Sequence, residues 1–365
     1  MRLTRFAALA AAVLGVFAVA SPASADPAVP AGFAPSSTSW TSPERGLVLG
    51  FTDCGTPGWC PSLLATTDGG KHWRQLPAPP MSLPDNHNQV RLTAFSQQLM
   101  YVTDGTKIVV TRDGGRHWLP VLQAGDTGQR RYVSKIAETG GRVFAVIRTY
   151  GDTEKTAIYS GIAGAPLLKP LPGFEVTGGL TDGDVTTDGG VQISLDADFS
   201  VEKYWTSADG AALTPATRPC PVGTTAVLGG VRDGQVIVLC NSGGGQPQPG
   251  SSERSIWRAP KLGGTFTGTA QAPVTGITQG FSAATADDAT VSAVGGGVGF
   301  LHRTTDGGQT WSTVRLSERG FELADLDFPG AGTGVVVDGL PDSDGGSAVY
   351  RTTDGGGHWA ELAFS

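Results

Sequence analysis

The chain has 365 residues, of which 16% are charged, and its formal net charge is −7. A net negative protein is repelled by nucleic acid and by anionic membranes, so neither is expected as a partner. Glycine (54 residues) and proline (24 residues) make up about a fifth of the chain. This composition is typical of short strands joined by many turns and argues against a protein built from long helices.

The N-terminus has the pattern of a signal peptide. Two arginines precede the apolar run 6–20, which is followed by a small-residue cleavage site ending at Ala25. The run is shorter than the roughly 20 residues that span a membrane, so a cleaved signal, residues 1–25, is favoured over a membrane anchor. Cleavage near Ala25 would release a secreted chain, residues 26–365, with a formal charge of −9.

Four cysteines in an exported chain predict two disulfides. Cys54 and Cys60 bracket a short loop, so they are predicted to pair locally, and Cys220 and Cys240 would then form the second bridge. Metal binding is the alternative, but neither pair has CxxC spacing and no histidine lies near either pair in the sequence. Three pairings are possible in principle, and the local one is our prediction. No metal and no cofactor are expected.

An eight-residue segment recurs along the chain, and we call each copy a box. The four strong copies, "TTDGGKHW", "TRDGGRHW", "TTDGGQTW" and "TTDGGGHW", begin at Thr66, Thr111, Thr304 and Thr352. The long gap between the second and third copies spans about four periods, which predicts three degenerate copies. These copies, "SGIAGAPL", "SADGAALT" and "APKLGGTF", begin at Ser160, Ser207 and Ala259.

Each repeat contains the pattern of four strands. Two strand patterns rich in β-branched and aromatic residues lie upstream of a third, which directly precedes the box, and a short fourth follows it. Units of this kind, repeated seven times over residues 26–365, predict a single all-β domain. We therefore expect a seven-bladed β-propeller of four-stranded antiparallel blades, with each box at the turn between the third and fourth strands.

The box pattern, Ser/Thr-x-Asp-x-Gly-x-Thr-Trp, resembles the Asp-box, also called the BNR repeat. The resemblance covers essentially the whole mature chain. Sialidases, xyloglucanases, sortilin-like receptors and photosystem II assembly propellers contain this repeat. A regular array of seven in one domain looks most like the photosystem-assembly type and its secreted bacterial relatives. The resemblance is specific for the fold and leaves the function open.

The recurring box residues are interpreted as structural. An aspartate at a turn can accept hydrogen bonds from the following N–H groups, a glycine pair permits positive φ, and tryptophan brings apolar area to the boundary between blades. One carboxylate per box is too few for a calcium loop. The residues assigned this role are Asp68, Trp73, Asp113, Trp118, Asp209, Asp306, Trp311, Asp354 and Trp359.

Three arginines just before the boxes of the last three repeats are candidates for ligand binding: Arg258, Arg303 and Arg351. The resemblance suggests this interpretation, because sialidases hold the carboxylate of sialic acid with three arginines. The alternative is that each arginine faces solvent or pairs with an acid between neighbouring blades. Because the boxes are expected far from the ring axis, we favour the alternative.

Asp325 and Asp327, in "LADLDF", are the candidates for catalysis. This segment is expected to be an innermost strand, whose alternate side chains share one face. Both carboxylates could then act as the pair of a glycoside hydrolase. A sialidase would also need an Arg-Ile-Pro motif, which is absent from the sequence, and a tyrosine nucleophile paired with a glutamate, for which we see no clear candidate.

The favoured hypothesis is an exported, non-catalytic propeller that binds a protein, peptide or glycan on one ring face. The long loops 240–254 and 148–155 would shape that face. The protein is expected to be a monomer that does not insert into membranes. The alternative hypothesis is a sialidase-like or other glycoside hydrolase.

Overall fold

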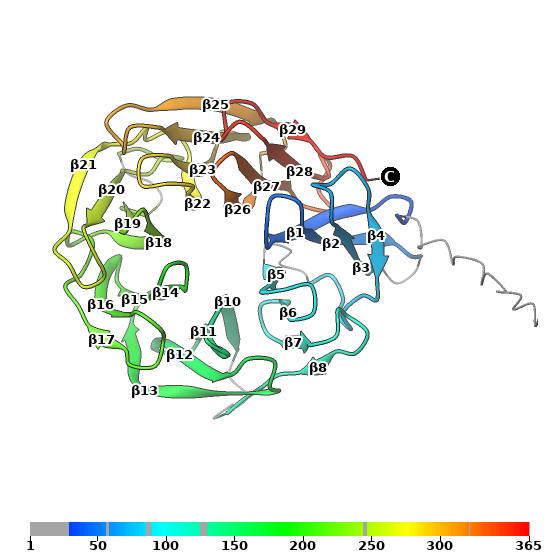
Figure 1. The fold of residues 1–365 in the computed structure, drawn as a ribbon, viewed down its shortest axis with the longest axis horizontal. Coiled ribbons are helices and arrows are strands. Elements are labelled where there is room, and N and C mark those ends of the chain that lie inside the picture. The colour runs from blue at the N-terminus through cyan, green and yellow to red at the C-terminus, as the bar shows by residue number, and fades with distance from the viewer. Residues whose placement is uncertain are drawn as a thin grey trace, which may run out of the picture.

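The computed structural model describes residues 29–55, 58–84, 89–124, 130–243, 247–320 and 322–364. The expected signal peptide, residues 1–25, lies outside them. The described residues form seven antiparallel sheets around a ring (Figure 1). The fold is therefore an all-β, seven-bladed β-propeller, as predicted. We number the sheets blade 1 to blade 7 in chain order.

Each blade runs from the ring axis to the rim in sequence order. The innermost strands are β1 (Ala34–Trp40), β5 (Arg91–Ala94), β10 (Arg131–Thr139), β14 (Thr181–Thr186), β18 (Thr225–Arg232), β22 (Ile277–Ala283) and β26 (Leu323–Gly330). The second strands are β2 (Gly46–Asp53), β6 (Met100–Thr103), β11 (Arg142–Thr149), β15 (Val191–Ala197), β19 (Gln235–Asn241), β23 (Ala289–Gly295) and β27 (Thr333–Gly339). The third strands are β3 (Trp59–Thr66), β7 (Ile108–Thr111), β12 (Glu154–Ile162), β16 (Ser200–Ser207), β20 (Arg254–Ala259), β24 (Val298–Thr304) and β28 (Ser347–Thr352). The outermost strands are β4 (Arg74–Leu76), β8 (Leu119–Pro120), β13 (Leu167–Gly178), β17 (Thr214–Pro215), β21 (Thr267–Gln271), β25 (Ser312–Ser317) and β29 (Ala360–Glu361).

The second strand of each blade carries much of the core. Both of its faces pack against neighbouring blades, so its residues form a continuous buried run instead of an alternating pattern. Every residue of β15 and of β27 is buried. The two-residue strands β8, β17 and β29 at the rim are exposed. Stacking of blades around the ring therefore buries the faces that a single blade would leave open.

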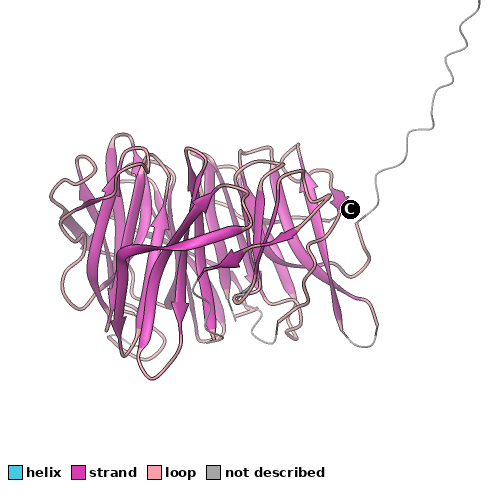
Figure 2. Ribbon diagram, turned by 90° about the horizontal axis from the view of Figure 1, so that it is seen from below, coloured by secondary structure: helices cyan, strands magenta, loops and turns pink. Residues whose placement is uncertain are grey.

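The boxes lie on one face of the ring, which we call the box face. The strands run between the two faces of the ring (Figure 2). Because they are antiparallel, the turn after the first strand and the turn after the third strand meet at the same end of the blade. Each box begins at the end of a third strand or two residues before it. In blade 1 the Gly69 N–H donates to the Glu44 carbonyl at 2.9 Å, which joins the box to the inner turn. Blades 2, 6 and 7 make the corresponding bond through Gly114, Gly307 and Gly355.

Blade 3 gains a fifth strand that the sequence did not predict. β9 (Leu122–Gln123) follows blade 2 and pairs in parallel with β13 through Leu122–Leu167 and Gln123–Leu168. A strand of two residues is too short to produce a recognisable sequence pattern.

Both predicted disulfides are confirmed. Cys54–Cys60 closes the loop between β2 and β3. Cys220–Cys240 ties the connection between blades 4 and 5 to the end of β19. Each bridge constrains an irregular segment on the ring face opposite the boxes.

The ring closes without a shared strand, because blade 1 is entirely N-terminal and blade 7 entirely C-terminal. The seam is a cluster of aromatic and aliphatic side chains centred on Trp73. The indole of Trp73 donates to the Ala363 carbonyl at 3.2 Å and its ring centroid lies 5.1 Å from that of Phe364. Trp40 packs on the other side at 6.4 Å. The C-terminal segment thus returns to blade 1 through side-chain packing.

Replacing Trp73 with alanine is therefore expected to destabilise the protein much more than the same change at Trp118. Trp73 is 7% exposed within the seam, so its removal should cost about 3–5 kcal/mol. Trp118 is only half-buried, so the corresponding loss should be about 1–2 kcal/mol. Urea unfolding of both variants measures the difference, and equal losses would contradict the seam as described.

Candidate functional site

The four complete boxes share one hydrogen-bonded turn. In blade 1, Thr66 Oγ1 donates to Asp68 Oδ1 (2.9 Å) and accepts the Gly70 N–H (2.9 Å). The same Asp68 oxygen accepts the His72 N–H at 3.0 Å. The boxes that begin at Thr111, Thr304 and Thr352 repeat these contacts.

The second carboxylate oxygen of each complete box is also occupied. His72 Nδ1 lies 2.6 Å from Asp68 Oδ2, and Thr310 Oγ1 donates to Asp306 Oδ2 at 2.6 Å. These hydrogen bonds lower the pKa of Asp306 to about 2 and hold the pKa of Asp68 well below its usual range. The histidine contact recurs in the pairs His117–Asp113 and His358–Asp354. Ionised carboxylates with both oxygens occupied are poorly suited to proton transfer.

The degenerate boxes keep little of this turn. In blade 4, Ser207 Oγ donates to Asp209 Oδ1 at 3.3 Å and accepts the Gly210 N–H at 3.0 Å. Blades 3 and 5 have no carboxylate at this position, where Ile162 and Lys261 stand instead.

The indole N–H groups of the four box tryptophans all donate to backbone carbonyls. Trp118 reaches Pro77 at 3.4 Å, beyond the end of blade 1. Trp311 and Trp359 bond within their own boxes, to Gly308 (3.2 Å) and Gly356 (3.1 Å). Together with Trp73 at the seam, these tryptophans have both an apolar surface and a satisfied donor.

The three candidate arginines lie outside the central cavity. They stand on the third strands of three different blades, and none lines the central cavity described below. Each has its own partner at a blade boundary or turn: Arg258 pairs with Asp287 (3.2 Å), Arg303 with Asp288 (2.6 Å), and Arg351 donates to the Pro43 carbonyl (3.1 Å).

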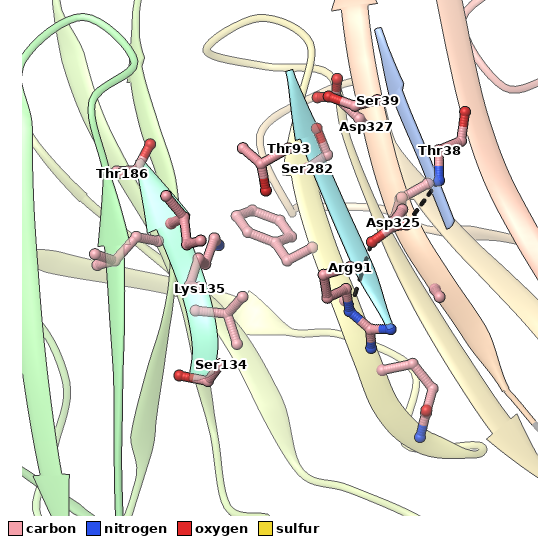
Figure 3. A pocket seen from close by; sticks show the side chains of 18 of the residues that line it. Thr38, Ser39, Arg91, Thr93, Ser134, Lys135, Thr186, Ser282, Asp325 and Asp327 are labelled. Atoms are coloured by element: carbon pink, nitrogen blue, oxygen red, sulfur yellow. Dashed lines mark hydrogen bonds and ion pairs between the residues drawn. The ribbon is translucent and has the colours of Figure 1, made fainter. Parts of the chain in front are cut away.

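A cavity of about 560 Å³ lies on the ring axis and is lined by residues of all seven innermost strands. Figure 3 shows its wall, to which Thr38, Arg91, Lys135 and Asp325 contribute from different blades. The lining mixes hydroxyl, cationic and acidic side chains with apolar ones such as Phe281. This cavity is the candidate functional site.

The cations of the cavity are all paired with acids. Arg91 Nη2 lies 3.0 Å from Glu322 Oε1, and Lys135 Nζ lies 2.8 Å from Asp184 Oδ1. Arg232 pairs with Asp188 and donates to the Ala283 carbonyl at 2.6 Å. Because each pair joins two different segments of the ring, the charges hold the wall together as well as facing the cavity.

Asp325 joins blade 7 to blade 1. Its Oδ2 accepts the Thr38 N–H at 2.9 Å and the Ser37 hydroxyl, and its Oδ1 lies 3.7 Å from Arg91 Nε. The residue has a φ of 51°, in a bulge of β26. This left-handed conformation is uncommon for a residue other than glycine, although aspartate tolerates it better than most. The interactions at the seam offset its cost.

Asp327 has different surroundings, although it lines the same cavity (Figure 3). The sequence had suggested that alternate residues of a regular strand would give both carboxylates one common face. β26 is not a regular strand, because the register shifts between Ala324 and Asp327 and again before Gly330, yet both carboxylates line the cavity. Burial raises the pKa of Asp327 to about 6. Of the two candidates, Asp327 is the one whose carboxyl group is not tied to blade 1.

A second acidic group, in blade 4, was not predicted from the sequence. Asp182 and Asp196 are register partners on β14 and β15, and Asp184 Oδ2 accepts the Leu228 N–H of blade 5 at 2.8 Å. Asp196 is 5% exposed, and its Oδ1 has no hydrogen-bond partner among the described residues. Burial, with the charges of Asp182 and Asp184, raises the pKa of Asp196 to about 8. Only the acids of "TDGDVT" (181–186), in an inner strand, could have drawn attention to this group.

Within 29–364, apart from the undescribed gaps, no group of three or more histidine, cysteine, aspartate or glutamate side chains is arranged to hold a metal ion. The same residues contain no helix that is long and apolar enough to cross a membrane.

A scan against known protein families finds no match, and neither does a search of curated proteins. Solved structures do resemble the chain. YCF48 bound to a D1 peptide is 14% identical with a TM-score of 0.54, over 89% of this chain and 95% of that one. YCF48 from Cyanidioschyzon merolae is 16% identical with a TM-score of 0.54, over 90% and 98%. An oligogalacturonate lyase from Vibrio parahaemolyticus is 8% identical with a TM-score of 0.56, over 89% and 92%.

At these identities the likeness shows the fold alone, and the fold is a β-propeller. The similar structures include a peptide-bound protein and a lyase, so the fold does not choose between binding and catalysis. That choice depends on the side chains of the cavity.

The two carboxylates of β26 are expected to respond differently to substitution. Asp325→Ala removes the acceptor of two hydrogen bonds and a partner of Arg91, and should cost about 2–4 kcal/mol of stability. Asp327 is not tied to blade 1, and asparagine has nearly the same shape as aspartate. Asp327→Asn should therefore change the free energy of unfolding by about 0.5 kcal/mol or less. Urea unfolding at neutral pH compares them, and similar losses in both variants would contradict this division.

The buried Asp196 should make the protein less stable in alkali. Its folded pKa, about 8, lies above its ordinary value of 3.8, so the folded state holds a proton that the unfolded state has lost. The resulting stabilisation is complete below about pH 4 and is lost as the pH rises through 8. Asp196→Asn should remove this loss, which is on the order of a few kcal/mol.

Thermal melting of wild type and Asp196→Asn at several pH values between 5 and 9 provides the measurement. The melting temperature of the variant should rise relative to that of the wild type as the pH increases. Asp152→Asn, in an exposed loop, is the control and should run parallel to the wild type. A parallel Asp196→Asn curve would mean that Asp196 is ionised in the folded protein.

Proposed function

We propose that the protein is an exported, non-catalytic propeller that binds a peptide or protein segment in its central cavity. The observation that carries this proposal is the cavity itself, which every blade lines and in which each cation is already paired with an acid. Paired charges among hydroxyl and apolar side chains suit recognition of a polar chain. A glycan is the other ligand class that hydroxyl-rich and aromatic lining would accept.

The assignment of Asp325 supports binding over catalysis. A retaining or inverting glycoside hydrolase uses two carboxyl groups on either side of the scissile bond. Asp325 is held by blade 1 and Arg91, which leaves Asp327 without the partner that the sequence suggested. The similar fold of YCF48, solved with a bound D1 peptide, adds a precedent for a propeller that binds a peptide.

Export and architecture form part of the same proposal. The signal pattern at 1–25 and the two disulfides together favour an oxidising compartment outside the cytoplasm. Residues 26–365 then act as a single domain and a monomer, because the blades of the closed ring bury one another's faces. The box aspartates and tryptophans are assigned to holding the blade turns.

The binding proposal is tested with the mature chain, a peptide array and a glycan array. Thr93→Arg adds a bulky side chain to the cavity wall, whereas Thr217→Arg makes the same change at an exposed site outside it. Thr93→Arg is expected to weaken binding of the selected ligand by about tenfold or more, equivalent to about 1.4 kcal/mol. Thr217→Arg should leave the affinity unchanged. Ligands that bind both variants equally would refute binding in the cavity.

A glycoside hydrolase remains the second candidate because of one observation. Burial raises the pKa of Asp327 to about 6, which is within the range that suits a general acid. Turnover of fluorogenic sialosides or polysaccharide fragments that is lost in Asp327→Asn would overturn the non-catalytic proposal. Asp325→Ala is unsuitable for this test, because loss of the seam contacts would itself abolish activity.

A further inference from the structure

The box of blade 3 departs most from the repeat in its chemistry. Its third position, which is aspartate in the four complete boxes, is Ile162, and its eighth position, which is tryptophan there, is Leu167. Ile162 is 75% exposed and Leu167 is also exposed. The turn has therefore exchanged a capping carboxylate and a packing aromatic for two exposed aliphatic side chains.

These side chains belong to a row that crosses four adjacent strands. Arg142 on β11 is the register partner of Ile162 on β12, and Leu167 on β13 is the partner of Leu122 on β9. Ser160 and Lys169 are register partners on β12 and β13, and Ile162 and Leu167 lie two residues away from them on the same strands, so they share that face. Register partners share a face of the sheet, so one cation and three aliphatic side chains lie on one face of blade 3, from β11 outward to β9.

The fifth strand of blade 3 completes the row. Leu122 is 66% exposed, and it reaches the row only because β9 pairs in parallel with β13. Single exposed apolar residues are ordinary on a protein surface, whereas contiguous ones mark interaction sites. The same short strand that departs from the regular four-stranded blade thus extends the apolar surface.

Two basic residues border the row. A pocket of about 330 Å³ opens beside Ile162 and is lined by Arg142, Lys169, Pro170 and Leu171, among others. Arg142 is held by Ser160 Oγ (2.8 Å) and the Gly210 carbonyl (3.1 Å). Lys169 is exposed and has no ion-pair partner among the described residues. In a chain of net charge −7, this is a locally positive pocket with an apolar wall.

Two acids at turns of blades 3 and 4, Glu138 and Asp209, are engaged within those turns. Glu138 Oε1 accepts the Gly141 N–H at 2.8 Å, and Asp209 Oδ1 accepts the Ala211 N–H at 2.9 Å. Neither pairs with Lys169 among the described residues.

We propose that this surface, the blade-3 patch (Leu122, Arg142, Ile162, Leu167 and Lys169), binds a partner polypeptide in which an aliphatic side chain stands next to an aspartate or glutamate. The aliphatic group packs on the row, and the carboxylate meets Lys169 and Arg142. A second copy of the chain would bring like charges together at this surface. The patch lies on the rim, apart from the central cavity, so this proposal stands without the proposed function.

The test is selection of a random phage-displayed peptide library on the mature protein. Selected peptides are expected to be enriched in an aliphatic residue next to aspartate or glutamate. Ile162→Asp and Lys169→Glu should each weaken binding of the selected peptides by about tenfold or more. The control is Val222→Asp, which alters a side chain that is 80% exposed on the connection between blades 4 and 5, and it should leave binding unchanged. Ile162→Asp is expected to fold, because its site is exposed and other boxes carry aspartate there.

Other outcomes overturn the proposal. Peptides that bind Ile162→Asp as tightly as wild type would place recognition outside the blade-3 patch. If binding of these peptides is abolished by Thr93→Arg, recognition lies in the cavity and the proposed function stands. Failure to enrich any peptide would also overturn it. Binding to phosphatidylserine vesicles that disappears in Ile162→Asp, without peptide enrichment, would assign the patch to lipid instead.

Discussion

The seam between blades 7 and 1 is the contact on which the whole ring depends. Each other pair of neighbouring blades is joined by the chain itself, but this pair has only side-chain and backbone contacts to hold it. Three sets of contacts, ordered from the ring axis to the rim, hold blades 7 and 1 together. Asp325 bonds the backbone at Thr38, Trp73 packs with Trp40 and Phe364, and Arg351 reaches the Pro43 carbonyl. Breaking any of these sets would expose the buried second strands on both sides.

The same need explains why acids and hydroxyls gather near the axis. The innermost strands of neighbouring blades do not pair as a sheet, so their facing N–H groups need other acceptors. Ser37 accepts the Leu92 N–H at 2.8 Å, and Asp184 accepts the Leu228 N–H at 2.8 Å. Asp325 makes the corresponding contact across the seam. A polar residue near the axis can therefore join two blades and line the cavity at the same time.

Which polar residues near the axis join neighbouring blades, and which only line the cavity, could not be predicted from the sequence. The box spacing predicted seven blades because the turn between third and fourth strands is local and needs the same residues each time. The short loop between Cys54 and Cys60 likewise predicted the first disulfide, and the two remaining cysteines were left to form the second. The bulge with positive φ at Asp325 could not be predicted, since the hydrogen-bond partner of Asp325 lies on a strand nearly 290 positions away in the chain. The pairing of Asp182 with Asp196 depends on strand register, which composition does not reveal.

Repetition then becomes a guide to function. A feature that seven blades share is explained by what all blades need, which is a stable turn and a packed boundary. Departures from the repeat have no such explanation, and they cost stability wherever a cap or a packing aromatic is lost. Ile162 replaces a charged cap with an exposed apolar side chain, and Asp327 keeps a half-buried acid without a tie to a neighbouring blade. In a fold built from near-copies, such residues are where interaction with other molecules is most reasonably sought.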